Sequence, residues 1–386
     1  MSFKPHYSRF LGGLGERLHF CAHSHHPWPD CTREAHLRAW DDAAARADEK
    51  WGIVLHEAIP HAQAAIAAAL RLKSSEEIAF APNTHEFICR LLSCLPDKPR
   101  LLTTDSEFHS FARQTARLEE DGAVVTRVPV EPFDTFVERF VGEAKGGARD
   151  MVFLSQVFFN SGLRLTVIDL EAVAAAVKAP TMLVVDGYHG FMAVPADLSK
   201  LGKTAFYLAG GYKYAQAGEG VCFLAVPPGC VLRPRNTGWF ADFAGLEKGL
   251  AKPVGYGDQG WRFWGSTFDP SGLYRWNAVT AWRRSLDLTV EKSDAHVRVL
   301  QARFLKRLAE KPRGPFKTEA LVSTDLARLG HFLTFRLHGA PALSKRLSAE
   351  CGVLTDARGD RLRFGFGLYH DEADVDALFT RLERFV

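Results

Sequence analysis

The chain has no marked excess of charge of either sign, since 48 Lys and Arg stand against 45 Asp and Glu among 386 residues, for a net charge of +3. This balance gives no electrostatic reason to expect a nucleic acid or a membrane surface as a partner. No apolar run approaches the ~18 residues of a membrane span. The first residues, MSFKPHYSRFLGG, lack the sustained apolar stretch of a signal peptide. The seven cysteines are odd in number and scattered, which indicates a reducing, cytoplasmic location rather than a disulfide framework.

The chain is long enough, and at 47% hydrophobic residues apolar enough, for one large core and a smaller domain. Between about residues 78 and 226, short apolar runs alternate with helical patterns, which predicts an α/β fold with a mostly parallel sheet covered by helices. After residue 312 the order strand, helix, strand, helix predicts a small α+β domain. The predicted segments are an N-terminal loop and helical part (1–75), a large α/β domain (76–272), a bridging helix (273–311) and the small domain (312–386).

Three helical patterns carry more specific predictions. Residues 32–73 are rich in Ala, Arg, Glu and Leu, and predict two helices broken near Gly52 and Pro60. Residues 273–309 predict one long helix. The last helix is expected over residues 372–385.

The clearest chemical signal lies in residues 181–227. One apolar run ends in Asp186, and a second is followed by Gly-Gly and then Lys213. Because ligands of open α/β sheets bind beyond the carboxyl ends of the strands, these two side chains are expected at one site. Pyridoxal phosphate (PLP) needs such a pair: a lysine that bonds to its aldehyde and a carboxylate that keeps its ring nitrogen protonated. Burial would favour the neutral lysine that this bond requires. The alternative is an acid in a turn and a lysine on the surface.

Several short motifs resemble kynureninases and, more broadly, the class V aminotransferase group of fold-type-I PLP enzymes. They are DGYH at 186–189, YKY at 212–214, RNTGWF at 235–240, DAR at 356–358 and LRFGF at 362–366. The resemblance extends from about residue 18 to the end of the chain. It implies the fold-type-I architecture, PLP as cofactor, an amino acid as substrate, and a homodimer with shared active sites.

The resemblance also implies roles for individual residues. It makes Lys213, Asp186 and His189 the catalytic set, with His189 supporting Asp186, and stacks Phe108 on the cofactor ring. The expected phosphate contacts are Asn83, Thr84, Tyr212, Trp239 and Thr267, the last from the neighbouring subunit. A helix that begins at Asn83 and Thr84 would also offer free N–H groups to a phosphate, although capping alone would select the same residue types.

On the substrate side, Arg363 alternates with apolar neighbours on a predicted strand, and its guanidinium suits an α-carboxylate. The alternative is a surface arginine on a half-exposed strand. The histidine-rich loop at residues 19–26 stands where kynureninases have a loop beside the substrate pocket, so His23 and Ser24 are candidate substrate contacts. Metal binding is not expected, because no carboxylate or cysteine completes a standard spacing. Solvated loop histidines are the alternative.

Two departures from the kynureninase pattern concern the site. The N-terminal loop differs, and Phe111 stands where kynureninases carry a second Asp near the cofactor. Support of the ring nitrogen then falls to Asp186 alone, or to a substitute from elsewhere in the chain.

The function expected from this resemblance is kynureninase-like hydrolysis of the Cβ–Cγ bond of an amino acid, with Lys213 as the base at Cα. A class V aminotransferase shares the same residues and is the alternative. A cysteine desulfurase needs a cysteine on a mobile loop, and the nearest candidate, Cys351, precedes a strand-like run. A PLP fold kept only for binding is the remaining alternative, and the intact Lys213, Asp186 and Arg363 argue against it.

Overall fold

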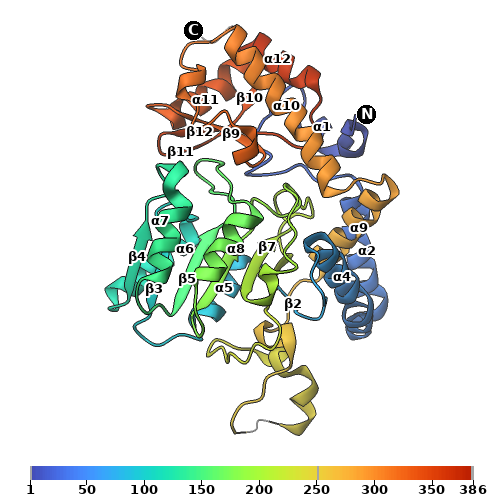
Figure 1. Ribbon diagram of the computed structural model, residues 1–386. Helices are drawn as coiled ribbons and strands as arrows, with labels where there is room; N and C mark the ends of the chain where they lie inside the picture. The colour runs from blue at the N-terminus through green and yellow to red at the C-terminus, as the bar shows by residue number, and fades with distance from the viewer. Residues whose placement is uncertain (1, 250–251, 384–386) are drawn as a thin grey trace.

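The computed structural model describes residues 2–249 and 252–383. Its large domain is built on a seven-stranded sheet of order β2-β8-β7-β6-β5-β3-β4 (Figure 1). The strands are β2 (Ile78–Ala81), β3 (Arg100–Thr104), β4 (Val124–Val128), β5 (Met151–Ser155), β6 (Met182–Asp186), β7 (Ala205–Gly210) and β8 (Cys222–Ala225). Five of them, β3 to β7, run parallel, and β8 is antiparallel to both its neighbours. The predicted α/β fold with a mostly parallel sheet is therefore confirmed.

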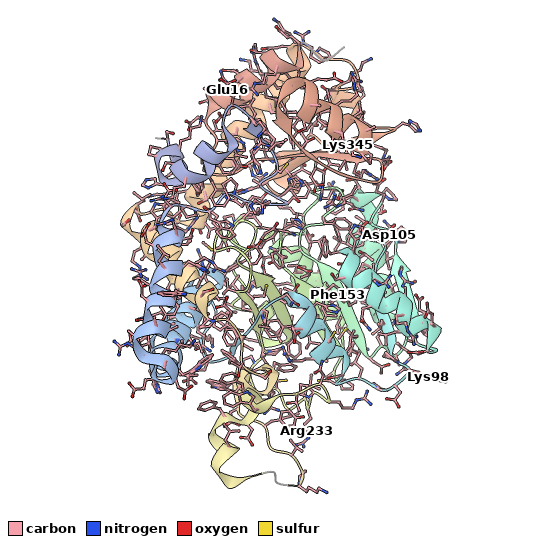
Figure 2. The ribbon with its side chains drawn as sticks, turned by 180° about the vertical axis from the view of Figure 1, so that it is seen from behind. Glu16, Lys98, Asp105, Phe153, Arg233 and Lys345 are labelled. Atoms are coloured by element: carbon pink, nitrogen blue, oxygen red, sulfur yellow. The ribbon has the colours of Figure 1, made fainter. Side chains whose placement is uncertain are left out.

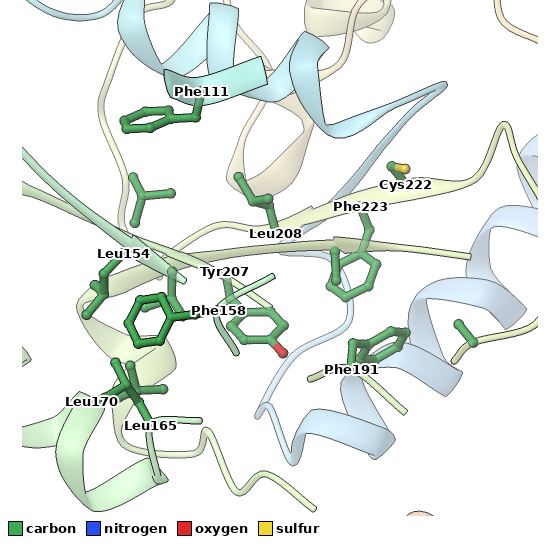
Figure 3. Packing of buried hydrophobic residues seen from close by; sticks show 14 of the residues in the cluster. Phe111, Leu154, Phe158, Leu165, Leu170, Phe191, Tyr207, Leu208, Cys222 and Phe223 are labelled. Carbon is green, nitrogen blue, oxygen red and sulfur yellow. The ribbon is translucent and has the colours of Figure 1, made fainter. Parts of the chain in front are cut away.

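Helices follow the strands and cover the sheet. They are α5 (Thr84–Leu92), α6 (His109–Glu120), α7 (Phe136–Lys145) and α8 (Val167–Ala176). Strands β5, β6 and β7 are buried on both faces, which explains why their sequences are continuous apolar runs rather than alternating ones. Figure 3 shows Phe111 on one side of the sheet and Phe158 and Leu170 on the other. Seen from behind, Phe153 lies in the interior, while Lys98 and Lys345 reach the surface (Figure 2).

The C-terminal domain holds a three-stranded antiparallel sheet, β11-β12-β9. Its elements are β9 (Phe332–Arg336), α11 (Ala340–Cys351), β10 (Val353–Leu354), β11 (Asp356–Arg358), β12 (Arg361–Gly365) and α12 (Glu372–Leu382). The N-terminal strand β1 (Leu18–His19) pairs in parallel with β10, so the start of the chain is joined to the small domain. Residues 384 and 385, the end of the predicted last helix, lie outside the described residues.

The predicted helix break near Gly52 and Pro60 is wrong. The chain breaks at Ala47, which has φ 47°, and then stays helical to residue 70. Pro60 lies in the first turn of a helix, where its missing N–H costs little, and a π-helical turn precedes it. The elements are α2 (Cys31–Arg46), η2 (Ala47–Glu49), α3 (Lys50–Ile53), η3 (Val54–Ala58) and α4 (Ile59–Leu70).

The helical run Cys31–Leu70 is long and apolar enough to cross a membrane by length and composition. A buried helix of a core passes the same test, and α4 buries one face, with Ile59, Ala62, Ile66 and Leu70 inside the core. Packing against the protein therefore accounts for its apolar residues.

The single bridging helix is also wrong, because two helices, α9 (Ser271–Ser285) and α10 (Val290–Glu310), fill this stretch. Asp287, between the two helices, has a positive φ of 48°, a conformation that a right-handed helix cannot contain. The side chain of Thr289 then caps α10 by accepting a hydrogen bond from Lys292 N. Shorter elements are η1 (Lys4–Tyr7), α1 (Ser8–Leu14), η4 (Phe133–Thr135), η5 (Leu201–Lys203), η6 (Trp239–Lys248), η7 (Gln259–Phe263), η8 (Thr318–Ala320) and η9 (Leu326–Arg328).

Candidate active site

A cavity of about 330 Å³ lies where the carboxyl ends of the strands face the small domain. From the large domain, six predicted residues line it: Thr84, Phe108, Asp186, His189, Tyr212 and Lys213. The N-terminal loop contributes His23 and Ser24, and β12 contributes Arg363. Larger hollows exist on the molecule, but this one gathers a lysine, a buried carboxylate and an arginine. The strand-end argument therefore locates the site.

Three predicted cofactor residues are not among the described residues that line the cavity. Asn83 caps α5, since its side chain accepts a hydrogen bond from Glu86 N at 3.0 Å. Trp239 opens η6 and is 42% exposed, and Thr267 follows η7. None of these three residues lines the cavity of its own chain, and their phosphate roles stay predictions.

Lys213 follows β7 and is enclosed by aromatic rings. Its Nζ lies 2.8 Å from Nε2 of His189, 4.7 Å from the centre of the Tyr188 ring and 5.5 Å from that of Phe108. Burial lowers the pKa of Lys213 to about 7, and the nearby Asp186 carboxylate partly opposes this shift. A large fraction of the amine is therefore neutral near pH 7, as an amine that attacks an aldehyde must be.

Asp186 ends β6 beside Ser155, the last residue of β5. Its carboxylate accepts a hydrogen bond from the backbone N–H of Tyr188 at 2.8 Å. Burial raises the pKa of Asp186, while this hydrogen bond and Lys213 lower it. A buried carboxylate with few partners suits a cationic ring nitrogen.

His189 contacts Lys213. The resemblance had implied instead that His189 supports Asp186. Its Nε2 lies 2.8 Å from Lys213 Nζ and 3.2 Å from the carbonyl oxygen of His23. Burial, Lys213 and Arg363 hold the pKa of His189 well below its ordinary value, so the imidazole is neutral. A neutral imidazole can share a proton with the amine without adding charge to the cavity.

Arg363 is 3% exposed, which excludes the alternative of a surface arginine. Its guanidinium donates hydrogen bonds to Asp356 and to the carbonyl oxygen of Phe159. Its Nε has no partner among the described residues. Burial lowers the pKa of Arg363 while Asp356 raises it, and the group stays a cation. The two hydrogen bonds hold the guanidinium in place, and its remaining N–H groups can donate to a carboxylate that enters the cavity.

The histidine-rich loop does not gather its rings around one point. Nδ1 of His19 lies 2.7 Å from the hydroxyl of Tyr369, and Nδ1 of His26 lies 2.7 Å from the carbonyl oxygen of Pro27. His25 contacts the Tyr212 hydroxyl at 2.9 Å. No cluster of three or more metal-ligating side chains occurs within residues 2–249 and 252–383.

These residues fit pyridoxal phosphate. The amine of Lys213 can bond to the aldehyde, and Asp186 can hold the ring nitrogen. Phe108 offers an aromatic face for the ring. Thr84 at the start of α5 and the Tyr212 hydroxyl offer donors to the phosphate.

Sequence reasoning missed Glu107, a second carboxylate near the site. It is 4% exposed, and it accepts hydrogen bonds from Thr104 Oγ1 at 2.7 Å and from Ser155 Oγ at 2.5 Å. Ser155 lines the cavity beside Asp186. Phe111, at the position where kynureninases carry Asp, is buried and stacks on Phe153, with the two ring centroids 3.7 Å apart. The position of Glu107 directly before Phe108 was the available signal in the sequence. Glu107 does not line the cavity and reaches it only through Ser155, so Asp186 is the carboxylate that faces the cofactor site.

Glu107 is expected to make stability depend on pH. Burial raises the pKa of Glu107 from its ordinary value of 4.5 to about 7. A carboxyl group with a higher pKa in the folded state keeps its proton longer when folded, so stability falls as pH rises from about 4.5 to about 7. The shift corresponds to about 3 kcal/mol. Urea unfolding of the wild type and Glu107→Gln across this range measures it, since the variant lacks this component.

The matched control is Glu120→Gln on the exposed end of α6, which is expected to follow the wild-type pH dependence. Parallel stability curves for wild type and Glu107→Gln would contradict the raised pKa of Glu107.

Together, the sheet, the buried lysine and carboxylate at its strand ends, and the arginine from the small domain define a fold-type-I PLP-dependent enzyme. The chain belongs to the family described as Aminotransferase class-V, whose family model matches residues 32–378. No curated protein sequence matches it significantly.

Solved structures share this fold. A mutant of C-DES with glycine covalently linked to the PLP cofactor is 18% identical, with a TM-score of 0.82 over 96% of this chain and 97% of that chain. The cystine C-S lyase C-DES with its product cysteine persulfide is 18% identical, with a TM-score of 0.82 over 96% and 98%. The cysteine desulfurase CsdA from Escherichia coli is 18% identical, with a TM-score of 0.78 over 99% and 97%. At these identities the likeness shows the fold.

Proposed function

We propose that this enzyme acts on an L-α-amino acid and breaks the bond between Cβ and a sulfur at the γ position. The observation that carries the proposal is the cavity itself: Lys213 lies 2.8 Å from a neutral His189, and Arg363 faces the same space. No cysteine is among the described residues that line it. This set supplies a base and a carboxylate anchor, and it lacks the thiol nucleophile of a desulfurase.

The chain's own residues account for the steps of such a cleavage. Arg363 binds the α-carboxylate and so fixes the orientation of Cα. The neutral amine of Lys213 takes the proton from Cα, and His189 keeps the resulting ammonium in place through its Nε2. The Cβ–S bond then breaks, and the proton on Lys213 passes to the departing sulfur. Bound PLP supplies the electron sink that makes the Cα proton acidic.

The position of Cys351 supports a lyase over a desulfurase. This residue ends α11, is 7% exposed, and borders a different hollow together with Glu16 and Arg381. A cysteine that attacks the substrate's sulfur must reach the reacting atoms. Among the solved structures of this fold, C-DES is described as a cystine C-S lyase, which is the same type of reaction as the one proposed.

Kynureninase-like hydrolysis of a Cβ–Cγ bond is the second candidate. The observation that favours it is that residues of three kynureninase-like motifs, Asp186, Lys213 and Arg363, meet in one cavity. This reaction also begins with loss of the Cα proton to Lys213 and differs in the group that leaves Cβ. An aminotransferase would share these residues but would need a keto acid as a second substrate.

A homodimer belongs to the same proposal. The segment that carries η6 projects from the large domain (Figure 1) and exposes Trp239, Phe243 and Leu246. Exposed aromatic side chains of this kind are enriched at interfaces. In a dimer, the resemblance places Thr267 of one subunit at the partner's cavity, which would account for its absence from the lining of its own cavity.

The products distinguish the candidates. The PLP-loaded enzyme is incubated with L-cystine or with L-kynurenine, with and without pyruvate. Cleavage of the Cβ–S bond gives pyruvate, ammonia and a persulfide from cystine, whereas the kynureninase-like reaction gives alanine and anthranilate. Cys351→Ala is expected to keep the cystine activity within about twofold, because a buried cysteine outside the cavity takes no part.

Cys230→Ala, a change of the same size outside the cavity, is the control. A loss of cystine activity beyond tenfold in Cys351→Ala alone would show that its thiol takes part in the reaction and would contradict the proposed lyase. Amine exchange that requires pyruvate, without cleavage, would identify an aminotransferase.

A further inference from the structure

A second arginine, Arg358 of β11, lies at the open side of the cavity. It is among the residues that line the cavity, together with Arg363 and Lys213. The side chain of Arg358 is 42% exposed, whereas that of Arg363 is 3% exposed. Arg363 therefore occupies the enclosed part of the cavity, and Arg358 occupies the part that solvent reaches. The proposed cleavage uses Arg363 and Lys213 and leaves Arg358 without a role.

One carboxylate holds both arginines. Asp356 accepts a hydrogen bond from Nη1 of Arg358 through Oδ1, at 2.8 Å, and another from Nη2 of Arg363 through Oδ2. Asp356 and Arg363 are cross-strand partners, and Arg358 follows two residues later on the same face of β11. Burial lowers the pKa of Arg363, Asp356 raises it, and the nearby charge of Arg358 lowers it. The fold thus fixes two guanidinium groups close together at one cavity.

The guanidinium of Arg358 keeps donors for a ligand. Its Nη1 is used twice, by Asp356 and by the carbonyl oxygen of Ala357 at 3.0 Å. Its Nε and Nη2 form no hydrogen bond with the described residues. A guanidinium has five N–H donors and matches the geometry of a carboxylate. Arg358 can therefore bind a carboxylate of a ligand while it remains bonded to Asp356.

The charges of this cluster do not balance. Among the described residues, Arg358 and Arg363 each form an ion pair with Asp356 alone, so two positive charges share one negative charge. The nearby Asp360 lies 3.2 Å from Nε of Arg361 instead. A zwitterionic amino acid with its α-carboxylate on Arg363 brings no net charge. An amino acid with a second carboxylate brings the one negative charge that the cluster lacks.

We propose that Arg358 binds a second carboxylate at the far end of the substrate's side chain, so that the enzyme selects acidic amino acids with sulfur at the γ position over neutral ones of the same size. The inference rests on the proposed function, because it takes the α-carboxylate to be bound by Arg363 and the bond that breaks to be the one between Cβ and sulfur. Arg358 is then a specificity-determining residue and takes no part in bond breaking.

The test compares S-carboxymethyl-L-cysteine with S-carbamoylmethyl-L-cysteine, which have the same shape and differ in ending in a carboxylate or a neutral amide. Each is titrated into the PLP-loaded enzyme, and the change in cofactor absorbance gives its Kd. We expect the wild type to bind the acid about tenfold more tightly, as for one charge-assisted hydrogen bond. Arg358→Gln is expected to remove this preference and to leave the Kd of the amide within about twofold. Arg358→Lys, which keeps the charge, is expected to retain part of the preference.

Salt provides a second measurement on the wild type. Because Arg358 is exposed, about 1 M salt is expected to reduce the preference for the acid. Arg336→Gln is the matched control, since it removes an equally exposed positive charge from the same small sheet, where Arg336 pairs with Glu131 outside the cavity. It is expected to keep the wild-type ratio of Kd values. Thermal unfolding of each variant shows whether it folds.

The outcomes separate this inference from the function on which it rests. Equal affinities in the wild type, or a tenfold preference kept in Arg358→Gln, would overturn the inference alone. An equal loss of affinity for both amino acids in Arg358→Gln would also overturn it, because Arg358 would then bind the α-carboxylate. A spectral response to L-cystine and to neither of the two test compounds would overturn it as well. No spectral response to any of the three would overturn the proposed function with it.

Discussion

Lys213→Ala is expected to lower kcat by at least about 10³-fold and to remove the visible absorbance band of lysine-bound PLP. The reason is that one amine has both tasks: it bonds to the aldehyde, and it takes the Cα proton. Its lowered pKa of about 7 and its contact with His189 at 2.8 Å are features of the buried site that no surface lysine can replace. Absorbance spectra of the purified variant and steady-state rates with L-cystine measure both effects.

Lys203→Ala provides the control, because this lysine ends η5 on the surface of the same domain. It is expected to keep both the band and the rate. If Lys213→Ala retained the band, the cofactor would be bonded to another lysine, and the assignment of the site would be wrong.

Arg363→Lys is expected to raise KM about 100-fold or more while kcat changes less. Lysine keeps the charge but loses the fork that Arg363 uses to bind Asp356 and Phe159 together, so the ammonium cannot hold the carboxylate in the same orientation. Hydrogen bonds between charged groups are worth about 1.5–3 kcal/mol each, and loss of one or two gives an effect of this size. Steady-state kinetics over a range of substrate concentrations separates KM from kcat.

The neighbouring Arg361→Lys is the matched control. Arg361 lies on the same strand, two residues away, and its guanidinium binds Glu131 at 2.9 Å outside the cavity. Its kinetics are expected to match those of the wild type. Equal KM values for Arg363→Lys and Arg361→Lys would remove Arg363 as the carboxylate anchor.

The strand-end positions of Lys213 and Asp186 could be predicted from the sequence, because buried parallel strands are continuous apolar runs and their carboxyl ends meet at one edge. The class of enzyme follows from that pair, and the family match confirms it. Arg363 could be placed on a strand, but only the tertiary structure shows that it is buried and held by Asp356.

Other features depend on packing that a local pattern does not encode. Glu107 looks like any polar residue after a strand, and only the register of β5 brings Ser155 to it. The partner of His189 is set by the turn after β6, not by spacing. Gly52 and Pro60 are usual helix breakers, yet the packing of the helix that contains them outweighs their propensity, and the break falls at Ala47 instead.

The pairing of the N-terminal strand with the small domain has a mechanical consequence. The β1–β10 ladder and the bonds of Phe20 and Cys21 to Gly365 tie residues 18–23 to the strand that carries Arg363. Any tilt of the small domain over the sheet must therefore move His23 and Arg363 together, as parts of one rigid unit. A ligand that pulls the guanidinium of Arg363 into the cavity would therefore also move the segment that carries His23 towards the ligand.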